Sequence, residues 1–239
     1  MMSNYISLEA GCRIYPVRGL AGSFHLLYDA DRNEAVLIDT GLVGEIRRLR
    51  HILGELGLGW PDIKAILLTH GHLDHTGNLA LLKELTGAPV LAHPLEQRHI
   101  DGVFPYSGPS RLCGLMEAAG RTLFRYQTVA IDHPLLPEVE LPYWGGLRVV
   151  HLPGHTEGHC GFYSKRFNLL FSGDLFASYW YSTHLPPFFL NSCPEQIPAS
   201  LRRVHALAPR HIFPNHYDGL DGEFHRRKFD ALTEKSVRL

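Results

Sequence analysis

The sequence predicts an α/β fold in which two β-sheets pack face to face with helices on both outer surfaces, a four-layer αββα sandwich. Two observations lead to this prediction. Strand-length and helix-length segments alternate along the chain, in two successive runs that each begin with strands and end with helices. Residues 65–69 (Ala-Ile-Leu-Leu-Thr) also form a continuous apolar run, as expected for a strand covered on both faces. We expect residues 1–239 to form one domain.

The first run of elements is predicted between residues 12 and 92. Its segments of strand character, separated by glycine-rich or polar turns, are 12–17, 23–28, 35–39, 65–69 and 89–92. A helix is predicted over 43–56, where apolar residues recur at helical spacing, and glycines at 57 and 59 end it. A second helix is predicted over about 77–85, ending at Gly87.

The second run follows a less regular stretch. Residues 94–142 contain short helical pieces over 95–100 and 110–120 among glycines and prolines, which we interpret as an irregular insertion over one end of the sheet. The predicted elements after it are strands over 147–151, 161–164 and 168–171, a helix over 194–207, a strand over 211–213 and a helix over 222–236.

Composition and charge narrow the classes of function. A formal net charge of −1 gives no electrostatic reason to expect nucleic acid or an anionic membrane as a partner, which favours a small-molecule substrate. No stretch approaches the roughly 20 apolar residues that span a bilayer, and the N-terminal residues lack the pattern of a secretory signal. Four cysteines are scattered without a C-x-x-C pair. These features predict a cytoplasmic protein.

The segment from Thr69 to His75 (Thr-His-Gly-His-Leu-Asp-His) is the most informative motif. It follows the predicted buried strand and precedes a helix. Neutral imidazole and carboxylate are ligands that hold zinc, and Gly71 lets the backbone turn where a side chain would clash. A single histidine is more often structural, but three histidines and an aspartate so close together favour metal binding.

Three more polar residues stand at the ends of predicted strands, namely His155, Asp174 and His216. Taken singly, they are also compatible with a loop histidine, a helix N-cap and a core histidine, respectively. Four such clusters at the same end of successive strands are better explained by one metal site.

These motifs resemble those of the metallo-β-lactamase superfamily, and among its branches the glyoxalase II and lactonase type. The resemblance covers nearly the whole chain in order and is carried by Asp39, His70-x-His72-x-Asp74-His75, Pro153-Gly154-His155-Thr156, Ser172-Gly173-Asp174 and Asn215-His216. It implies the metallo-β-lactamase fold.

The resemblance also implies a ligand set. His70, His72 and His155 would hold one metal. Asp74, His75 and His216 would hold a second, and Asp174 would bridge the two. Asp39 corresponds to a buried acid that orients histidine ligands without touching metal, although it can also be read as a turn residue that ends a strand.

The activity that the resemblance implies is that of a dinuclear metal-dependent hydrolase. A hydroxide bridging two divalent metal ions would attack a small ester, thioester or lactone, with Asp74 and Asp174 as catalytic residues and Asp74 able to relay a proton. Zinc is the expected metal, while iron and manganese also suit histidine and aspartate ligands.

The sequence departs from some members of this family. Antibiotic-hydrolysing members normally have cysteine where this chain has Asp174, and glyoxalase II has a longer helical region after the position of His216. Alternatives are an iron-dependent redox enzyme of the same fold (persulfide dioxygenase-like), a phosphodiesterase or nuclease, and a non-catalytic binding protein. The full set of seven ligands argues against a mononuclear iron enzyme, and the balanced charge argues against a nuclease.

Residues 178–189 form an aromatic, proline-rich segment four positions beyond Asp174. It could form the apolar rim of a substrate cleft, a hydrophobic plug under a loop, or the interface of a homodimer. Tyr179, Tyr181 and Tyr217 are the candidate substrate-pocket residues, because each hydroxyl could donate a hydrogen bond to a substrate.

Overall fold

A computed structural model of the protein describes residues 3–19, 21–42 and 44–236. Its first sheet has seven strands in the order of the sequence. Strands β1 to β4 pair antiparallel, and β4 to β7 pair parallel. The strands are β1 (Ile6–Ser7), β2 (Cys12–Arg18), β3 (Ser23–Asp29), β4 (Glu34–Ile38), β5 (Ile63–Leu67), β6 (Val90–Ala92) and β7 (His133–Pro134).

The second sheet has five strands in the order β14-β11-β10-β9-β8. Its pairs are antiparallel except for β11 and β14, which run parallel. The strands are β8 (Glu140–Leu141), β9 (Leu147–His151), β10 (Cys160–Ser164), β11 (Leu169–Gly173) and β14 (His211–Pro214). A separate two-stranded ribbon consists of β12 (Ala177–Ser178) and β13 (Thr183–His184).

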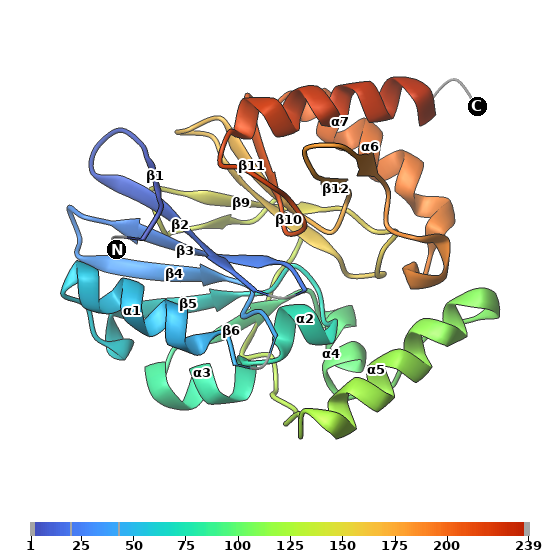
Figure 1. Cartoon of the computed structure of the whole chain (residues 1–239), viewed down its shortest axis with the longest axis horizontal. Coiled ribbons are helices and arrows are strands. Elements are labelled where there is room, and N and C mark those ends of the chain that lie inside the picture. Colours follow the sequence, from blue (N-terminus) through green and yellow to red (C-terminus); the bar gives the residue numbers. More distant parts are fainter. Residues whose placement is uncertain (1–2, 20, 43, 237–239) are drawn as a thin grey trace.

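Helices cover the outer faces of both sheets. Figure 1 shows α1 and α3 outside the first sheet, and α6 and α7 outside the second. The α-helices are α1 (Ile46–Leu56), α2 (Leu73–Thr76), α3 (Leu79–Thr86), α4 (Gln97–Ile100), α5 (Arg111–Leu123), α6 (Ile197–Leu207) and α7 (Gly222–Ser236). Short 3-10 helices are η1 (Trp60–Asp62), η2 (Pro94–Glu96), η3 (Gly108–Ser110), η4 (Phe188–Leu190) and η5 (Pro194–Gln196).

Three apolar layers separate four layers of secondary structure, which confirms the predicted αββα sandwich. The middle layer lies between the sheets, where residues such as Leu27 and Ile38 of the first sheet meet Phe162 and Phe171 of the second. Alternate side chains of a strand point to opposite faces, so the other residues of each sheet pack outward. One outer layer packs under α1 and α3, and the other packs under α6 and α7.

The predicted elements recur with shifted boundaries. The first predicted helix begins at Ile46 rather than at residue 43, which lies outside the described residues. The predicted strand over 65–69 spans Ile63–Leu67, because the backbone leaves the sheet before the histidine motif. Within that motif a four-residue helix, α2, precedes α3. Five two-residue strands were not predicted, since two residues cannot show a periodic pattern.

The stretch over 94–142, predicted as an irregular insertion, contains more regular secondary structure than expected. It contains α4 and α5, and its last part joins the two sheets, because β7 extends the first sheet and β8 extends the second. In Figure 1, α5 extends away from both sheets. Over the described residues, no helix combines the length and the apolar character that a membrane crossing requires.

The middle layer is the part of the core on which the fold depends most directly. We expect Phe162→Ala to lower the free energy of unfolding by about 3–5 kcal/mol, because the ring is fully buried and its removal leaves a cavity between the sheets. Leu123→Ala is the control: this leucine is 75% exposed, and the expected change is within about 0.5 kcal/mol. Denaturant unfolding of both variants measures the difference, and equal losses would contradict the assignment of the core.

Candidate metal centre

Segments that follow four strands supply all of the predicted metal ligands. After β5, His70 and His72 lie in a loop and Asp74 and His75 lie in α2, and the loops after β9, β11 and β14 carry His155, Asp174 and His216. Strands β9 and β11 both pair antiparallel with β10, and β14 pairs parallel with β11, so these three strands end at one edge of their sheet. Packing of the two sheets brings that edge next to the end of β5.

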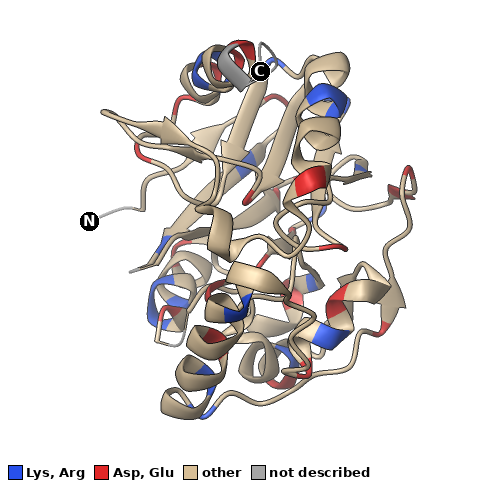
Figure 2. Cartoon of the chain, turned by 90° about the vertical axis from the view of Figure 1, so that its right-hand side faces the viewer, with Lys and Arg blue, Asp and Glu red and all other residues tan. Residues whose placement is uncertain are grey.

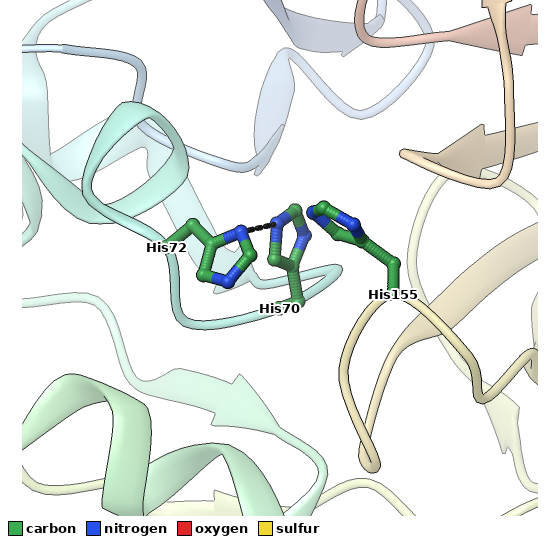
Figure 3. A group of neighbouring side chains, drawn as sticks. All are labelled: His70, His72 and His155. Atoms are coloured by element: carbon green, nitrogen blue, oxygen red, sulfur yellow. Dashed lines mark hydrogen bonds between the residues drawn. The ribbon is translucent and has the colours of Figure 1, made fainter. Parts of the chain in front are cut away.

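His70, His72 and His155 form the first group of candidate ligands. One ring nitrogen of each lies within 4.8 Å of the others, and all three side chains are buried. Nε2 of His70 and Nδ1 of His72 are 3.1 Å apart, and the ring of His155 faces them from the second sheet (Figure 3). Gly71 is required between the two histidines, since a Cβ there would lie 2.6 Å from the Cβ of His99.

Hydrogen bonds on the far side of the rings decide which nitrogen of each histidine faces the group. Nε2 of His72 bonds to the hydroxyl of Tyr106, which leaves Nδ1 turned inward. Nδ1 of His155 bonds to Oδ1 of Asn191 at 3.0 Å. Its Nε2 is buried and has no hydrogen-bond partner among the described residues. A buried nitrogen without a partner costs free energy unless a ligand fills that role, and a metal ion fits this position.

Asp74, His75, Asp174 and His216 form the second group, again with ligand atoms within 4.8 Å of one another. Oδ2 of Asp74 lies 3.5 Å from Nε2 of His216 and 3.7 Å from Nε2 of His75. Two carboxylates facing two imidazoles form a donor set that suits zinc, iron or manganese.

Asp174 lies between the two groups. Its Oδ1 is 3.4 Å from Nε2 of His75, and its Oδ2 is 3.0 Å from Nε2 of His216. Oδ2 is also 3.7 Å from Nε2 of His155, which belongs to the first group. One carboxylate therefore contacts ligands of both groups, as a bridging ligand would.

Asp39 bonds to the second group on the side away from the metal position. It is fully buried, and its backbone adopts the left-handed region (φ 63°), which aspartate and asparagine tolerate better than most residues. Its Oδ2 accepts from Nδ1 of His75 at 2.9 Å and from Nδ2 of Asn215 at 2.7 Å, while Thr69 donates to both carboxylate oxygens. Asp39 thus fixes the orientation of His75 without facing the metal position.

Several residues that sequence reasoning missed also hold the ligands. His159 donates from Nδ1 to the Leu152 carbonyl, so its Nε2 accepts the backbone N–H of Asp174 at 3.0 Å. Glu96 is fully buried and accepts from the backbone N–H of Gly71 at 2.7 Å. It also accepts from the Thr156 hydroxyl and the Gly158 N–H, so one carboxylate joins the His70–His72 loop to the His155 loop. The position of His159, four residues after His155, could have pointed to it. Nothing in the sequence indicates that Glu96 is buried.

The two groups differ in their protonation. Burial, reinforced by the neighbouring histidines, holds the pKa of His70 and His72 well below its usual value, and burial also lowers the pKa of His155. These three candidate ligands are therefore neutral near pH 7. Burial opposes charge on His75, but the surrounding carboxylates raise its pKa well above the usual value. Asp174 raises the pKa of His216 to about 10. The second group therefore favours positive charge, which a bound cation would supply.

Two cavities open onto the candidate ligands. One, of about 200 Å³, lies against His155, Asp174 and His216, and its other walls are Phe176, Ala177, Tyr179, His184, Pro186, Pro187 and Leu190. The other, of about 280 Å³, also reaches His72 and Asp74 and is walled by Ala21, Leu42, Leu73, Cys113, Met116, Glu117 and Leu190. A larger cavity of about 400 Å³, lined in part by Arg18, Arg47 and Arg48, contains none of the candidate ligands.

The three tyrosines that were predicted to line a substrate pocket lie in three different environments. Tyr179 lines the smaller cavity at the ligands. Tyr181 is fully exposed and lines neither cavity. Tyr217 does not fit the prediction: it is buried between the sheets, and its hydroxyl bonds to Nε2 of His25 at 3.1 Å. The sequence cannot reveal this, because Tyr217 directly follows His216 and the backbone turns its ring into the core.

Known proteins share both the sequence pattern and the fold. A family model described as the metallo-beta-lactamase superfamily matches residues 18–186. The chain is 30% identical over 167 residues to the probable metallo-hydrolase YybB of Bacillus subtilis, covering 68% of this chain and 66% of that protein. It is 32% identical over 165 residues to the hydroxyacylglutathione hydrolase GloC of Haemophilus influenzae, covering 68% and 70%.

Among solved structures, a metallo-beta-lactamase family protein of Thermus thermophilus, TTHA1429, is similar with a TM-score of 0.75 at 25% identity, covering 97% of this chain and 81% of that one. A second protein, TTHA1623, solved in a di-iron-bound form, has a TM-score of 0.62 at 27% identity, covering 95% and 98%.

The position of Asp39 leads to a first prediction for this site. Asp39→Asn keeps the size and the tolerated backbone conformation but replaces one accepting oxygen with a donating amide. We expect metal affinity to fall about 10–100-fold, as for other residues that orient a ligand. Chelator competition measures the affinity. Asp132→Asn, which removes a surface carboxylate paired with Lys83 at 2.7 Å, is the control. Unchanged affinity in Asp39→Asn would contradict the orienting role.

Glu96 leads to a second prediction. An amide at this position offers one oxygen to three donors, so Glu96→Gln leaves at least one buried donor unpaired. We expect the free energy of unfolding to fall by about 1–3 kcal/mol. Metal affinity should fall with it, since both ligand loops lose a common anchor. Exposed Glu84→Gln serves as the comparison, and identical unfolding curves for the two variants would refute the anchoring role.

Proposed function

Because the chain belongs to the metallo-beta-lactamase superfamily, we propose that it is a dinuclear metal-dependent hydrolase that cleaves a small ester, thioester or lactone. One observation carries this proposal: Asp174 contacts ligands of both candidate metal groups. A mononuclear enzyme would use one group only, whereas the carboxylate placed between two complete groups supports a paired site. The names of its relatives, metallo-hydrolase and hydroxyacylglutathione hydrolase, agree with hydrolysis.

The chemistry follows from the donor set. Two bound divalent cations would lower the pKa of a shared water, making it a nucleophile near neutral pH, and would polarise the scissile carbonyl. The three neutral histidines of the first group would hold a cation without cancelling its charge, and so would preserve its acidity. Hydrogen bonds from Asp39 and Asn191 fix the rings of His75 and His155, so that little reorganisation is needed when substrate binds.

Two side chains are proposed to act on protons and on the substrate oxygen. Asp74 is partly exposed and lines the larger cavity, so it can pass a proton towards the leaving group, although binding to a metal reduces its basicity. Tyr179 lines the smaller cavity, from which its hydroxyl can donate a hydrogen bond to a substrate oxygen.

Zinc is the proposed metal. The di-iron-bound form of TTHA1623 keeps iron as an alternative for this donor set. A persulfide dioxygenase-like reaction is less well supported, because it would leave the second group without a function. A phosphodiesterase or nuclease is less well supported too, because Lys, Arg, Asp and Glu are interspersed at the end of the molecule from which α5 projects (Figure 2).

The proposal predicts two divalent cations per chain and hydrolysis that chelation abolishes. His72→Ala and His216→Ala, which remove one ligand from each group, should each reduce the metal content towards one per chain. Both should lower kcat/KM for a thioester or lactone by roughly 10³-fold, or about 4 kcal/mol of transition-state stabilisation. Elemental analysis and a panel of small thioesters, esters and lactones provide the measurements.

The control is His205→Ala, a 60% exposed histidine of α6 outside both groups, which should keep two metals and full activity. One iron per chain with an inert panel would overturn the hydrolase proposal. Two metals in His216→Ala would overturn the assignment of the second group.

A further inference from the structure

We propose that the cavity lined by Arg18, Arg47 and Arg48 is a second ligand site, which binds a small organic phosphate. This basic cavity shares no lining residue with the two cavities at the candidate metal ligands, so its ligand is a separate molecule and does not depend on the proposed hydrolase function. Three features of the cavity support this assignment: the positive charge of its walls, the absence of carboxylate partners for its arginines, and its apolar floor.

The basic cavity lies between the end of β2 and the first half of α1. Its volume of about 400 Å³ falls within the range of about 300–1,000 Å³ that is typical of small-molecule sites. Arg18 comes from β2, whereas Arg47, Arg48 and His51 come from α1. The described residues that line the cavity include no aspartate or glutamate. Its walls therefore attract anions and repel cations.

No carboxylate among the described residues pairs with the three arginines of the basic cavity. The two acids that flank them in the sequence have other contacts. Glu45 accepts the backbone N–H of Leu42 at 3.3 Å, and Glu55 accepts that of Ser3 at 3.0 Å and lies 3.4 Å from His51. The first turn of α1 also contains two arginines and no acid, although this end of a helix favours negative charge. An anionic ligand would relieve this concentration of positive charge. The ion pairs that arginines do form over the described residues belong to Arg32, Arg121, Arg148, Arg210, Arg226 and Arg227.

Hydrogen bonds to backbone carbonyls hold two of the guanidinium groups in place. Nη2 of Arg18 donates to the carbonyl of Gly219 at 2.9 Å, and the Arg18 guanidinium lies 5.5 Å from the ring centre of Tyr217. Nη1 of Arg48 donates to the carbonyl of Arg18. Each bond uses one of several N–H groups of a guanidinium, so most of the donors remain for a ligand. Arg47 is exposed, and no described residue bonds to its side chain. Two positioned guanidinium groups and a third that can close over a ligand thus share one cavity.

The number of cationic donors favours a phosphate group over a carboxylate. A phosphate monoester carries about two negative charges at neutral pH and has three strong acceptor oxygens. Guanidinium groups bind such oxygens in pairs, through charge-assisted hydrogen bonds. A carboxylate has a single charge and two oxygens, so it cannot bond to three guanidinium groups as fully. The arginines from β2 and α1 can therefore use all three oxygens of one phosphate group.

The floor of the basic cavity is apolar. Val17 and Ile52 line it and are only 1% and 4% exposed, and Pro16 and Leu220 line it too. Apolar surroundings strengthen hydrogen bonds between charged groups, because they lower the local dielectric constant. They also offer a surface that an uncharged part of the ligand can cover, which inorganic phosphate cannot do. This floor is the reason to expect a phosphate group attached to a compact organic body.

The test is a calorimetric titration of the full, metal-loaded chain with three probes. Benzylphosphonate has the proposed group on a compact apolar body and contains no ester bond that the enzyme could hydrolyse. Phenylacetate has the same body with a carboxylate, and inorganic phosphate lacks the body. We expect benzylphosphonate, titrated as the dianion, to bind at least about tenfold more tightly than either of the others, a difference of about 1.4 kcal/mol.

A matched pair of variants on α1 locates the bound probe. Arg47→Glu removes a guanidinium donor from the basic cavity and adds a like charge, so the affinity for benzylphosphonate should fall at least about tenfold. Arg50→Glu makes the same change of charge on the same helix, at an exposed residue that lines none of the three cavities. It should weaken binding by less than about threefold, through the screened field alone. Neither side chain has a partner among the described residues, so both variants should unfold like the wild type.

Saturable binding that Arg47→Glu removes and Arg50→Glu retains would support the site. Full binding in both variants would place the probe elsewhere, for example on the metal centre, and equal losses in both would reduce the effect to general electrostatic attraction. Either result would overturn the proposal, as would the absence of saturable binding. Phenylacetate or inorganic phosphate binding as tightly as benzylphosphonate would overturn the assignment of an organic phosphate. None of these results bears on hydrolysis, so the proposed function stands or fails separately.

Discussion

Packing of the two sheets against each other is the constraint on which the candidate centre depends. His70 and His72 follow a strand of the first sheet, while His155, Asp174 and His216 follow strands of the second. Neither sheet carries a complete group, since His155 completes the first group and Asp174 and His216 complete the second. The apolar layer around Phe162 and Phe171 therefore determines the distance between the ligands as well as the stability of the fold. This explains how a deeply buried cluster of imidazoles can be held in place: hydrophobic burial between the sheets stabilises an arrangement that the polar groups alone would not form.

Buried polar residues fix the orientation of the candidate ligands that sheet packing brings together. Asp39, Asn191, Tyr106 and His159 each bond to a ligand or to its backbone on the side away from the metal position. The bonds of Asp39, Asn191 and Tyr106 each occupy one ring nitrogen of a histidine, and His159 holds the backbone of Asp174, so the candidate ligands are oriented without a metal. Glu96 adds a connection between two ligand loops that come from different sheets. The result is a division between a group of neutral histidines and a group in which carboxylates favour positive charge, with Asp174 shared by both.

The surroundings of the centre carry the information about substrate. The walls of the two cavities come largely from the segment after β11 and from helix α5, and Ala21, Leu42 and Leu73 complete the larger cavity. Apart from the candidate ligands and Glu117, these walls are largely apolar, and Arg121 and Lys228 nearby donate to backbone carbonyls. The candidate metal centre thus depends on the geometry of its ligands, whereas the cavity walls depend on the composition of the surrounding segments.

The layered fold and the seven candidate ligands could both be predicted from the amino-acid sequence, because both depend on local patterns. Apolar periodicity defines strands and helices wherever they are long enough, and the ligands stand directly after such strands, within short motifs such as His70-x-His72-x-Asp74-His75. Residues that act across long separations in the chain become apparent only once the chain is folded. Glu96 contacts Gly71 and Thr156, Asn191 contacts His155, and Tyr217 points into the core although it adjoins a ligand. A buried hydrogen bond between distant residues leaves no period and no spacing in the chain, and the direction of a side chain in a loop is set by packing against elements far away in the sequence.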